Sequence, residues 1–334
     1  MNSFGKLFRV SIFGESHGIS VGIVIDGCPA GIPLEPGDFE ADFSRRKSGA
    51  KGTTPRKEPD VPRLMSGVFN GRTTGAPLMV LFENTNTRSR DYSQLKDIPR
   101  PGHADYTGHV KFGGYQDYRG GGHFSGRLTL GLVAAGVIAK KIIAPARVSA
   151  SILEVGGSSD IEAALERAME NGDSIGGIIQ CTISPVPAGL GEPFFDSVEA
   201  VMSHMIFSIP AIKGIEFGSG FRAAKMTGSE HNDNILSPDG TTETNYAGGI
   251  NGGISNGNEI IFRVAVKPTS STHRTQRTLN MATGKMVDLT VEGRHDTCIA
   301  LRVPVVVEAA AAMVMADFML QAQVVKRINE SKSE

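Results

Sequence analysis

The chain has 334 residues, of which 40% are hydrophobic and 21% charged, and its formal net charge at pH 7 is −1. This composition is ordinary for a soluble globular protein, and the near-neutral charge gives no general attraction to nucleic acid or membrane. The chain contains 41 glycines, about twice the usual frequency, which predicts many tight turns and binding sites lined by backbone.

The three cysteines, Cys28, Cys181 and Cys298, are far apart and odd in number. This pattern favours reduced thiols in a reducing compartment and argues against a structural zinc site. The first ten residues include Lys6 and Arg9 and do not have the pattern of a signal peptide. We also find no run of roughly 18 uninterrupted apolar residues, the length that a membrane-spanning helix needs. We therefore expect a soluble cytoplasmic protein without a metal site.

In the first half of the chain, short β-branched and aromatic runs predict strands at residues 7–13, 21–26 and 78–82. A short helix is expected at residues 38–46. Residues 129–143 are apolar on all sides, which predicts a helix buried in the core. Residues 45–63 have no apolar period and are expected to form a loop.

In the second half, an amphipathic helix is expected at residues 160–171, with Asp160 as its N-cap and Gly172 as its end. A second amphipathic helix is expected at residues 197–207, and a long alanine-rich helix at residues 305–328. The patterns of the remaining segments predict strands at residues 178–184, 259–266 and 286–291.

Two segments of the chain resemble each other: VGIVIDGCPAG at residues 21–31 and GGIIQCTISPVPAG at residues 176–189. A helix is expected after each. This similarity indicates a duplicated strand–turn–helix unit, and so one domain with two similar halves, about residues 1–150 and 151–334, that share a core. The order of elements does not alternate regularly enough for a doubly wound sheet, which favours an α+β fold.

Residues 100–127 hold three of the eight histidines, His103, His109 and His123, in a glycine-rich segment. The consecutive glycines at 120–122 are unsuited to a regular helix or strand, but they let backbone amides approach a flat or anionic ligand closely. Histidine changes charge near neutral pH. We interpret the segment as a functional loop; the alternative is a solvated surface loop.

Four further polar segments combine turn residues with titratable side chains, at residues 14–18, 45–57, 267–271 and 293–296. If they converge with residues 100–127, the site would hold histidines, arginines, serines and an aspartate. Such a set suits an anionic substrate that undergoes proton transfers. A flavin-free phosphate lyase or phosphotransferase would use the same residue types.

Each segment also has a simpler interpretation. The basic run at 45–57 could be a solvated face or an RNA-binding arm, although it lacks the interleaved aromatics that stack on bases. Asp296 could form a surface ion pair with Arg294. Ser16 next to His17 suggests a hydrolase, but the G-x-S-x-G motif is absent, and we set that function aside.

Several long motifs occur in order along nearly the whole chain: LFRVSIFGESHG at 7–18, RPGHADYTG at 100–108, DYRGGGHFSGR at 117–127 and GRHDTCIALRVPVVVEA at 293–309. In these motifs the chain closely resembles the chorismate synthase family. The resemblance implies a lyase of the shikimate pathway of aromatic amino-acid biosynthesis. The reaction is the anti-1,4-elimination of phosphate from 5-enolpyruvylshikimate 3-phosphate to give chorismate.

The resemblance also implies a cofactor, a fold and an assembly. The family uses reduced FMN without net redox change, and some members reduce the flavin with NADPH. Its fold is a layered α+β sandwich of helices and antiparallel or mixed sheets with internal duplication. Its members are homotetramers, and neither nucleic acid nor a membrane is expected as a partner.

The catalytic roles that the resemblance implies fall on five residues. His17 as an imidazolium would offset charge on the leaving phosphate, and His103 would partner the anionic N1 of the reduced flavin. Asp296, with Ser16 and Ser125 in a hydrogen-bond chain, would take the proton from flavin N5.

The ligand contacts that the resemblance implies are more numerous. Substrate contacts are expected from Arg46, Arg127 and Arg294, since a guanidinium binds phosphate or carboxylate bidentately. FMN contacts are expected from His123, Phe124, Ser125, Pro210, Ala211, Gly252, Lys267, Pro268, Thr269, Ser270, Ser271 and Arg294. NADPH contacts are expected from Arg46 and Lys51. The chain departs from the family at His123–Phe124, where many members have Arg–Ser, at Thr297, usually proline, and in a shorter region at 147–173.

Overall fold

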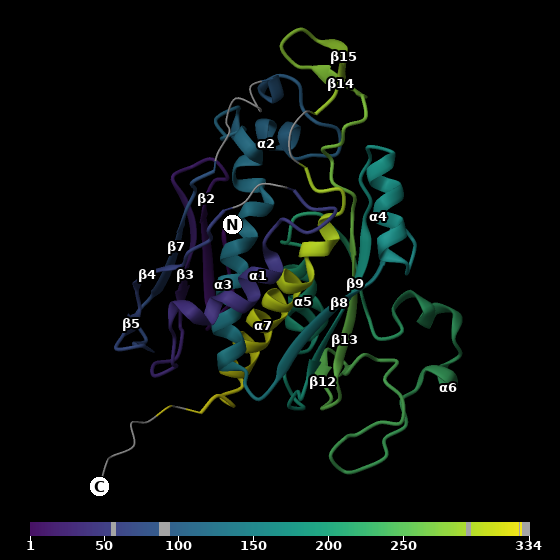
Figure 1. Ribbon diagram of the computed structural model, residues 1–334. Helices are drawn as coiled ribbons and strands as arrows, with labels where there is room; N and C mark the ends of the chain where they lie inside the picture. Colours follow the sequence, from purple (N-terminus) through teal and green to yellow (C-terminus); the bar gives the residue numbers. More distant parts are fainter. Residues whose placement is uncertain (55–57, 87–93, 292–294, 327, 329–334) are drawn as a thin grey trace.

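The computed structural model describes residues 1–54, 58–86, 94–291, 295–326 and 328. Two antiparallel sheets form the outer layers, and helices fill the space between them (Figure 1). The first sheet has the order β1-β2-β3-β7-β4. Its strands are β1 (Ser3–Phe4), β2 (Arg9–Gly14), β3 (Ser20–Asp26), β7 (Leu78–Glu83) and β4 (Arg63–Ser66).

The second sheet has the order β10-β13-β9-β8. Its strands are β10 (Ile212–Phe217), β13 (Ile260–Val266), β9 (Gly177–Ser184) and β8 (Arg147–Val155). Short strand pairs complete the β structure: β5 (Val68–Phe69) with β6 (Arg72–Thr73), β11 (Ile250–Asn251) with β12 (Ile254–Ser255), and β14 (Gln276–Asn280) with β15 (Lys285–Leu289).

The α-helices are α1 (Glu40–Arg46), α2 (Asp105–Phe112), α3 (Thr129–Ile142), α4 (Ile161–Glu170), α5 (Val198–Ile206), α6 (Gly228–His231) and α7 (Pro304–Gln321). The 3-10 turns are η1 (Pro36–Phe39), η3 (Arg119–Phe124), η4 (Gly126–Leu128), η5 (Phe194–Asp196), η6 (Gly220–Lys225) and η7 (Ile299–Arg302). Helix α3 packs on the first sheet through β3, and α7 packs on the second through β8 and β9.

The centre of the core is the contact between α3 and α7, which lie side by side in Figure 1. A Cβ atom on Gly136 of α3 would lie 2.3 Å from the Cβ of Ala309 in α7. Only small residues at these two positions let the helix axes approach so closely, and Ala310, Ala311 and Ala312 continue the buried small-residue surface of α7. Helix α7 is long and apolar enough to cross a membrane, but 89% of it is buried inside the fold. It is the central helix of the core.

The two halves of the chain have the same strand order. In the first half β2, β3, α1, β4, β7 and α3 follow in sequence, and the strands pair in the order β2-β3-β7-β4. In the second half β8, β9, α5, β10, β13 and α7 follow, and the strands pair in the order β8-β9-β13-β10. This common order supports our proposal that the halves arose by duplication.

The α+β sandwich expected from the sequence is confirmed. The expected helices at 38–46, 129–143, 160–171 and 197–207 are present within a few residues, and Asp160 caps α4 through a 3.1 Å hydrogen bond from the Ala163 amide. Three expectations were wrong. Residues 105–112 form a helix inside the segment expected to be a loop, strands β8, β10 and β14 were missed, and the last helix ends at Gln321 rather than at residue 328.

Candidate active site

Two adjacent cavities lie where the loops between the elements meet the ends of α1, α3 and η7. The smaller, about 450 Å³, is lined by Arg46, Lys47, Arg127 and Arg302, and we call it the arginine cavity. The larger, about 680 Å³, is lined by His103, His123, His204 and His295, and we call it the histidine cavity. Both volumes fall in the range of small-molecule sites. The residues that line both cavities are Gly120, Ser125, Gly126, Thr129, Ile209, Pro210, Asp296 and Ile299.

The three glycines 120–122 form a turn with φ values of +59°, +80° and +52°, a conformation that other residues rarely adopt. A Cβ on Gly120 would lie 2.6 Å from Cδ2 of His17 and 2.9 Å from Oγ of Ser16. A Cβ on Gly121 would lie 3.4 Å from Cε1 of His103. The turn therefore passes between the two histidines expected to be catalytic. Both Ser16 and His17 are buried behind Gly120 and lie outside the lining of either cavity.

His103 is oriented by an ion pair within its own segment. Its Nδ1 lies 2.6 Å from Oδ1 of Asp105, and Arg100 binds the same carboxylate through two contacts of 2.8 Å. Burial alone would raise the pKa of Asp105, but the hydrogen bonds from Arg100 and His103 outweigh it and hold that pKa well below its usual range. With Nδ1–H donating to the carboxylate, Nε2 is left for a ligand in the histidine cavity.

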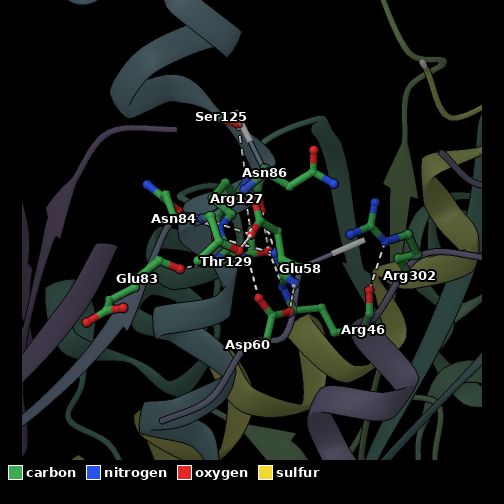
Figure 2. Close-up of polar contacts among 12 residues, drawn as sticks. Arg46, Glu58, Asp60, Glu83, Asn84, Asn86, Ser125, Arg127, Thr129 and Arg302 are labelled. Carbon is green, nitrogen blue, oxygen red and sulfur yellow. Dashed lines mark hydrogen bonds and ion pairs between the residues drawn. The ribbon is translucent and has the colours of Figure 1, made fainter. Parts of the chain in front are cut away.

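In the arginine cavity, one carboxylate bridges two guanidinium groups (Figure 2). Oδ2 of Asp60 lies 3.3 Å from Nη1 of Arg46, and Oδ1 of Asp60 accepts a hydrogen bond from Nη1 of Arg127. Arg46 also donates to Oγ1 of Thr129 at 3.2 Å, and Arg127 donates to Oδ1 of Asn84 at 3.0 Å. The two arginines expected to bind substrate are thus fixed side by side.

Burial, together with the neighbouring charges of Arg302 and Arg127, lowers the pKa of the Arg46 guanidinium to about 9, although Asp60 and Asp296 oppose the shift. A buried cation in this surrounding is stabilised by any anion that enters the cavity. The site is therefore electrostatically suited to an anionic ligand.

Asp296 is held by an ion pair with Arg302. The alternative interpretation, a surface pair between Asp296 and Arg294, lies outside the described residues because Arg294 is not among them. Both carboxylate oxygens of Asp296 lie 3.3 Å from Nη1 of Arg302, and the Thr54 amide donates to Oδ1 at 2.9 Å. The side chain is 13% exposed and lines both cavities. Nε of Arg302 also donates to the Arg46 carbonyl at 2.8 Å, which ties the two sites together.

All five residues of the KPTSS segment, Lys267 to Ser271, line the histidine cavity. Oγ1 of Thr269 is buried and has no hydrogen-bond partner among the described residues. Lys267 Nζ and Ser270 Oγ both donate to the Gly102 carbonyl, the latter at 2.8 Å. A buried hydroxyl without a partner costs free energy unless a ligand or water satisfies it.

Two further residues on this cavity show local constraint. Ala211 has a φ of +75°, an unusual value for a residue other than glycine, and its carbonyl accepts from the Lys267 amide at 2.9 Å. His123 contacts the Gly14 carbonyl through Nδ1 at 2.8 Å and Oδ1 of Asn2 through Nε2 at 3.2 Å. Phe124, at 37% exposure, also lines the cavity.

Most of the expected site residues line one or both cavities. Arg46 and Arg127 line the arginine cavity; Ser125, Pro210 and Asp296 line both. The residues that line the histidine cavity alone are His103, His123, Phe124, Ala211, Lys267, Pro268, Thr269, Ser270 and Ser271.

Besides Ser16 and His17, two expected residues line neither cavity, and another lies outside the described residues. Lys51 pairs with Glu166 of α4 at 2.5 Å and lines neither cavity, so the structure does not bring it together with Arg46. Gly252 lies in the exposed turn between β11 and β12 and also lines neither cavity. Arg294 falls in the part of the chain that the structure leaves undescribed.

Sequence reasoning missed Asp60 and Arg302, because each of them binds a partner that is distant in sequence. Asp60 is 67 residues from Arg127, and Arg302 is 256 residues from Arg46. Arg302 does stand inside the GRHD motif region, which was a signal that the residue mattered without showing what it touches. Among the described residues no cluster of three or more His, Cys, Asp or Glu side chains is placed to hold a metal ion.

Comparisons with known proteins identify the family of the chain. Residues 8–320 match the family model described as chorismate synthase. A chorismate synthase of Chitinophaga pinensis is 64% identical over 98% of this chain and 99% of its own length. One from Dehalococcoides mccartyi is 45% identical over 98% and 99%, respectively. A solved structure described as a crystal structure of chorismate synthase superposes with a TM-score of 0.73 at 24% identity, covering 96% of this chain and 93% of its own, which shows a common fold.

Proposed function

The chain belongs to the chorismate synthase family and has its carbon–oxygen lyase activity, and we propose that the two cavities divide the reaction between substrate and cofactor. The family reaction converts 5-enolpyruvylshikimate 3-phosphate to chorismate. The observation that supports this division most strongly is the separation of side chains. Three guanidinium groups line the arginine cavity and one, that of Arg100, lines the histidine cavity, whereas the four lining histidines all belong to the histidine cavity. Asp296 lies at the wall that the cavities share.

We propose that the arginine cavity binds the substrate. The substrate carries a phosphate and two carboxylates, and the cavity offers Arg46, Lys47, Arg127 and Arg302 to receive them. The side chains of Arg46 and Arg127 are each 5% exposed, so solvent screens their charges only weakly. Preorganised cations of this kind stabilise the negative charge that develops on a leaving phosphate.

We propose that the histidine cavity holds reduced FMN. Three features of the chain support this fit. The buried Thr269 hydroxyl has no partner among the described residues, and the 120–122 turn lets a ligand approach the backbone closely. Because Nδ1 of His103 contacts Asp105, its Nε2 is available to a ligand. When bound, reduced FMN supplies an electron-rich ring that assists loss of phosphate and of the ring hydrogen without net oxidation. Lys267 and the hydroxyls of residues 269–271 would bind its phosphate or ribityl oxygens.

The proton relay is the role we propose for Asp296. Its carboxylate lies on the wall that both cavities share, and Arg302 and the Thr54 amide hold it in one orientation. Ser125 lines the same wall, and Ser16 lies against Gly120 behind it. A carboxylate in this place can accept a proton on one side and return it to solvent through hydroxyl groups.

Anaerobic turnover tests the proposal directly. The purified protein is mixed with 5-enolpyruvylshikimate 3-phosphate, with FMN reduced by dithionite, without FMN, and with oxidised FMN. Chorismate should form only with reduced FMN. Equal turnover without flavin would contradict the FMN assignment and favour the flavin-free phosphate lyase.

The RNA-binding alternative loses support in the structure. Of the basic run, Arg45 binds Glu308 at 2.7 Å, Arg46 binds Asp60, and Lys51 binds Glu166. Arg46 is buried, and the half-exposed Arg45 and Lys51 are each paired with a carboxylate. A basic face for RNA would need them exposed and unpaired.

The finer features of the family are part of the same proposal. We propose a cytoplasmic homotetramer that takes its electrons from NADPH, either directly or through a separate reductase. The position of Lys51 at α4 gives no support to a joint NADPH site with Arg46. Replacing dithionite by NADPH in the turnover assay tests self-reduction.

A further inference from the structure

Asp60 occupies an unusual place in the arginine cavity. Its carboxylate lies between Arg46 and Arg127 and gives one oxygen to each (Figure 2). The Asp60 side chain is 3% exposed, and both arginine side chains are 5% exposed. The carboxylate is therefore the nearest negative charge to both groups that we assign to substrate binding.

The backbone at Asp60 adopts a φ of +53°. Residues other than glycine adopt this conformation at a cost, and aspartate and asparagine adopt it more readily than the rest. Strained conformations of this kind persist only where the surrounding structure holds them, and they cluster at functional sites. The chain thus keeps a carboxylate here although glycine would suit the backbone better.

Uncharged hydrogen-bond acceptors already orient the side chains of both arginines. Arg127 donates to Oδ1 of Asn84 at 3.0 Å and to the Glu83 carbonyl at 3.4 Å. Arg46 donates to Oγ1 of Thr129 at 3.2 Å and to the Arg127 carbonyl at 3.3 Å. These uncharged acceptors would orient the guanidinium groups without Asp60. What Asp60 adds is its charge.

We propose that Asp60 sets the net charge of the arginine pair to +1, so that the cavity binds the phosphate of the substrate but releases inorganic phosphate after elimination. The proposal rests on the proposed function, which places the substrate in this cavity. Asp60 acts through the two arginines and is a positioning and charge-setting residue. It does not itself react.

The physical reason is the balance of charges around a dianion. Without Asp60 the pair would carry +2 in a buried site and would match a phosphate dianion, which binds tightly and leaves slowly. With Asp60 a second negative charge on the ligand meets a carboxylate nearby. Charges in buried sites are weakly screened, so one charge changes anion affinity considerably.

Asp60→Asn tests this, because asparagine keeps the shape and tolerates the positive φ while removing the charge. Binding of inorganic phosphate is measured by calorimetry in the absence of flavin. The variant should bind phosphate at least about tenfold more tightly than the wild type, a difference of about 1.4 kcal/mol. Asp239→Asn, which removes an exposed carboxylate in a surface turn, should bind it like the wild type.

Kinetics separate this role from a merely structural one. In Asp60→Asn, phosphate release should limit turnover, so kcat should fall while KM does not rise, and rapid mixing should show a burst of chorismate. If Asp60 only held the arginines in place, KM would rise and phosphate would bind more weakly. Weaker or unchanged phosphate binding in a folded Asp60→Asn protein overturns the proposal.

A further variant, Arg127→Gln, distinguishes failure of this inference from failure of the proposed function. Arg127→Gln should weaken phosphate binding at least about tenfold. If the wild type binds no phosphate, or Arg127→Gln has no effect, the substrate cavity is misassigned and the inference fails with it. If Arg127→Gln weakens binding but Asp60→Asn does not strengthen it, the inference alone fails.

If Asp60→Asn does not fold, the proposal can be tested with the wild type. A pair of net charge +1 gains little from a second ligand charge, so phosphate should bind less than about tenfold more tightly than formate at pH 8. A preference of a hundredfold or more for phosphate overturns the proposal.

Discussion

At the scale of single residues, the site depends on contacts that fix a charge or a ring in one orientation. Asp105 orients His103, Arg302 orients Asp296, and Asp60 joins the two buried arginines. Asp105 is itself held by Arg100, and Arg302 by the Arg46 carbonyl, which is how preorganised sites keep their geometry. The reacting groups proposed here therefore have neighbours whose loss should be measurable.

Asp296→Asn tests the proton-accepting role. Asparagine keeps the shape and the Oδ1 acceptor for the Thr54 amide but loses basicity, so single-turnover rate should fall by about 10²-fold or more. Flavin and substrate should still bind. Asp173→Asn is the matched control, because Asp173 forms a partly exposed pair with Arg274 at 3.7 Å and should keep full activity. Normal turnover by Asp296→Asn would remove it from the relay.

The two histidines on either side of the glycine turn give a second residue-scale prediction. His17→Ala and His103→Ala should each lower the rate by about 10²–10⁴ if each handles a proton or a developing charge. His109→Ala is the control, since His109 lies in α2 of the same segment and lines neither cavity. Normal activity of His103→Ala would contradict the catalytic role of His103. An equal loss of activity in His109→Ala would show that the loss is not specific to the site residues.

At the scale of elements, the position of α1 depends on a buried carboxylate in α7. Glu308, 3% exposed, binds Arg45 of α1 at 2.7 Å, Lys140 of α3 at 3.0 Å and the Ala150 amide of β8 at 2.9 Å. Because Arg45 precedes Arg46, this contact fixes the end of α1 that carries an arginine into the cavity. One side chain thus links both helices of the core to the second sheet.

Glu308→Gln should lower the free energy of unfolding by roughly 2–4 kcal/mol, somewhat less than for a fully buried pair because Arg45 is 45% exposed. Urea denaturation at pH 7 measures this. Glu162→Gln, whose side chain is 80% exposed, should change it by less than about 0.5 kcal/mol. Equal stability of the wild type and Glu308→Gln would mean that the network is not stabilising.

The ion pairs of Glu308 also predict that the free energy of unfolding depends on pH. Burial would raise the pKa of Glu308, but the ion pairs with Arg45 and Lys140 outweigh it and lower that pKa below the usual 4.5. Because the folded pKa is the lower one, the stabilisation is present above pH 4.5 and is lost as pH falls through the folded pKa. The difference in unfolding free energy between wild type and Glu308→Gln should shrink as the pH is lowered below 4.5.

The elements also show what the sequence could and could not predict. Strand β13 and helix α4 were predictable because their buried residues recur with a clean period. Helix α2 was not, because it lies on the surface and buries only Gly108, where a Cβ would lie 2.8 Å from the Phe124 ring. Strand β8 (residues 147–155) alternates exposed and half-buried residues, but only Val155 is fully buried, and the small residues at 149–151 interrupt its apolar pattern. Asp60 had no local signal, since its partners come from other elements.

At the scale of the whole molecule, several large apolar side chains remain exposed in the single chain. Phe194 and Phe195 of η5 are 88% and 93% exposed, and Phe221 of η6 is 83% exposed. Exposed aromatic side chains at such values are typical of surfaces buried between subunits. They are consistent with the proposed homotetramer.

Light scattering after size exclusion tests the assembly. The wild type should have about four times the 35.4 kDa mass of the chain, and the variant Phe194→Ser/Phe195→Ser should shift toward smaller species at low concentration. Met169→Ser, at 47% exposure on α4, serves as a control that removes an exposed apolar side chain elsewhere. A monomeric wild type would contradict the proposed assembly.

The division of ligands between the two cavities is the central claim, and paired binding titrations test it most directly. Flavin binding is followed by its spectrum and phosphate binding by calorimetry, in the wild type, in Thr269→Val with Lys267→Met, and in Arg127→Gln. We predict that the first variant loses at least about tenfold in flavin affinity and binds phosphate normally, while Arg127→Gln does the reverse. Loss of both ligands to a similar degree in both folded variants would contradict separate substrate and cofactor cavities.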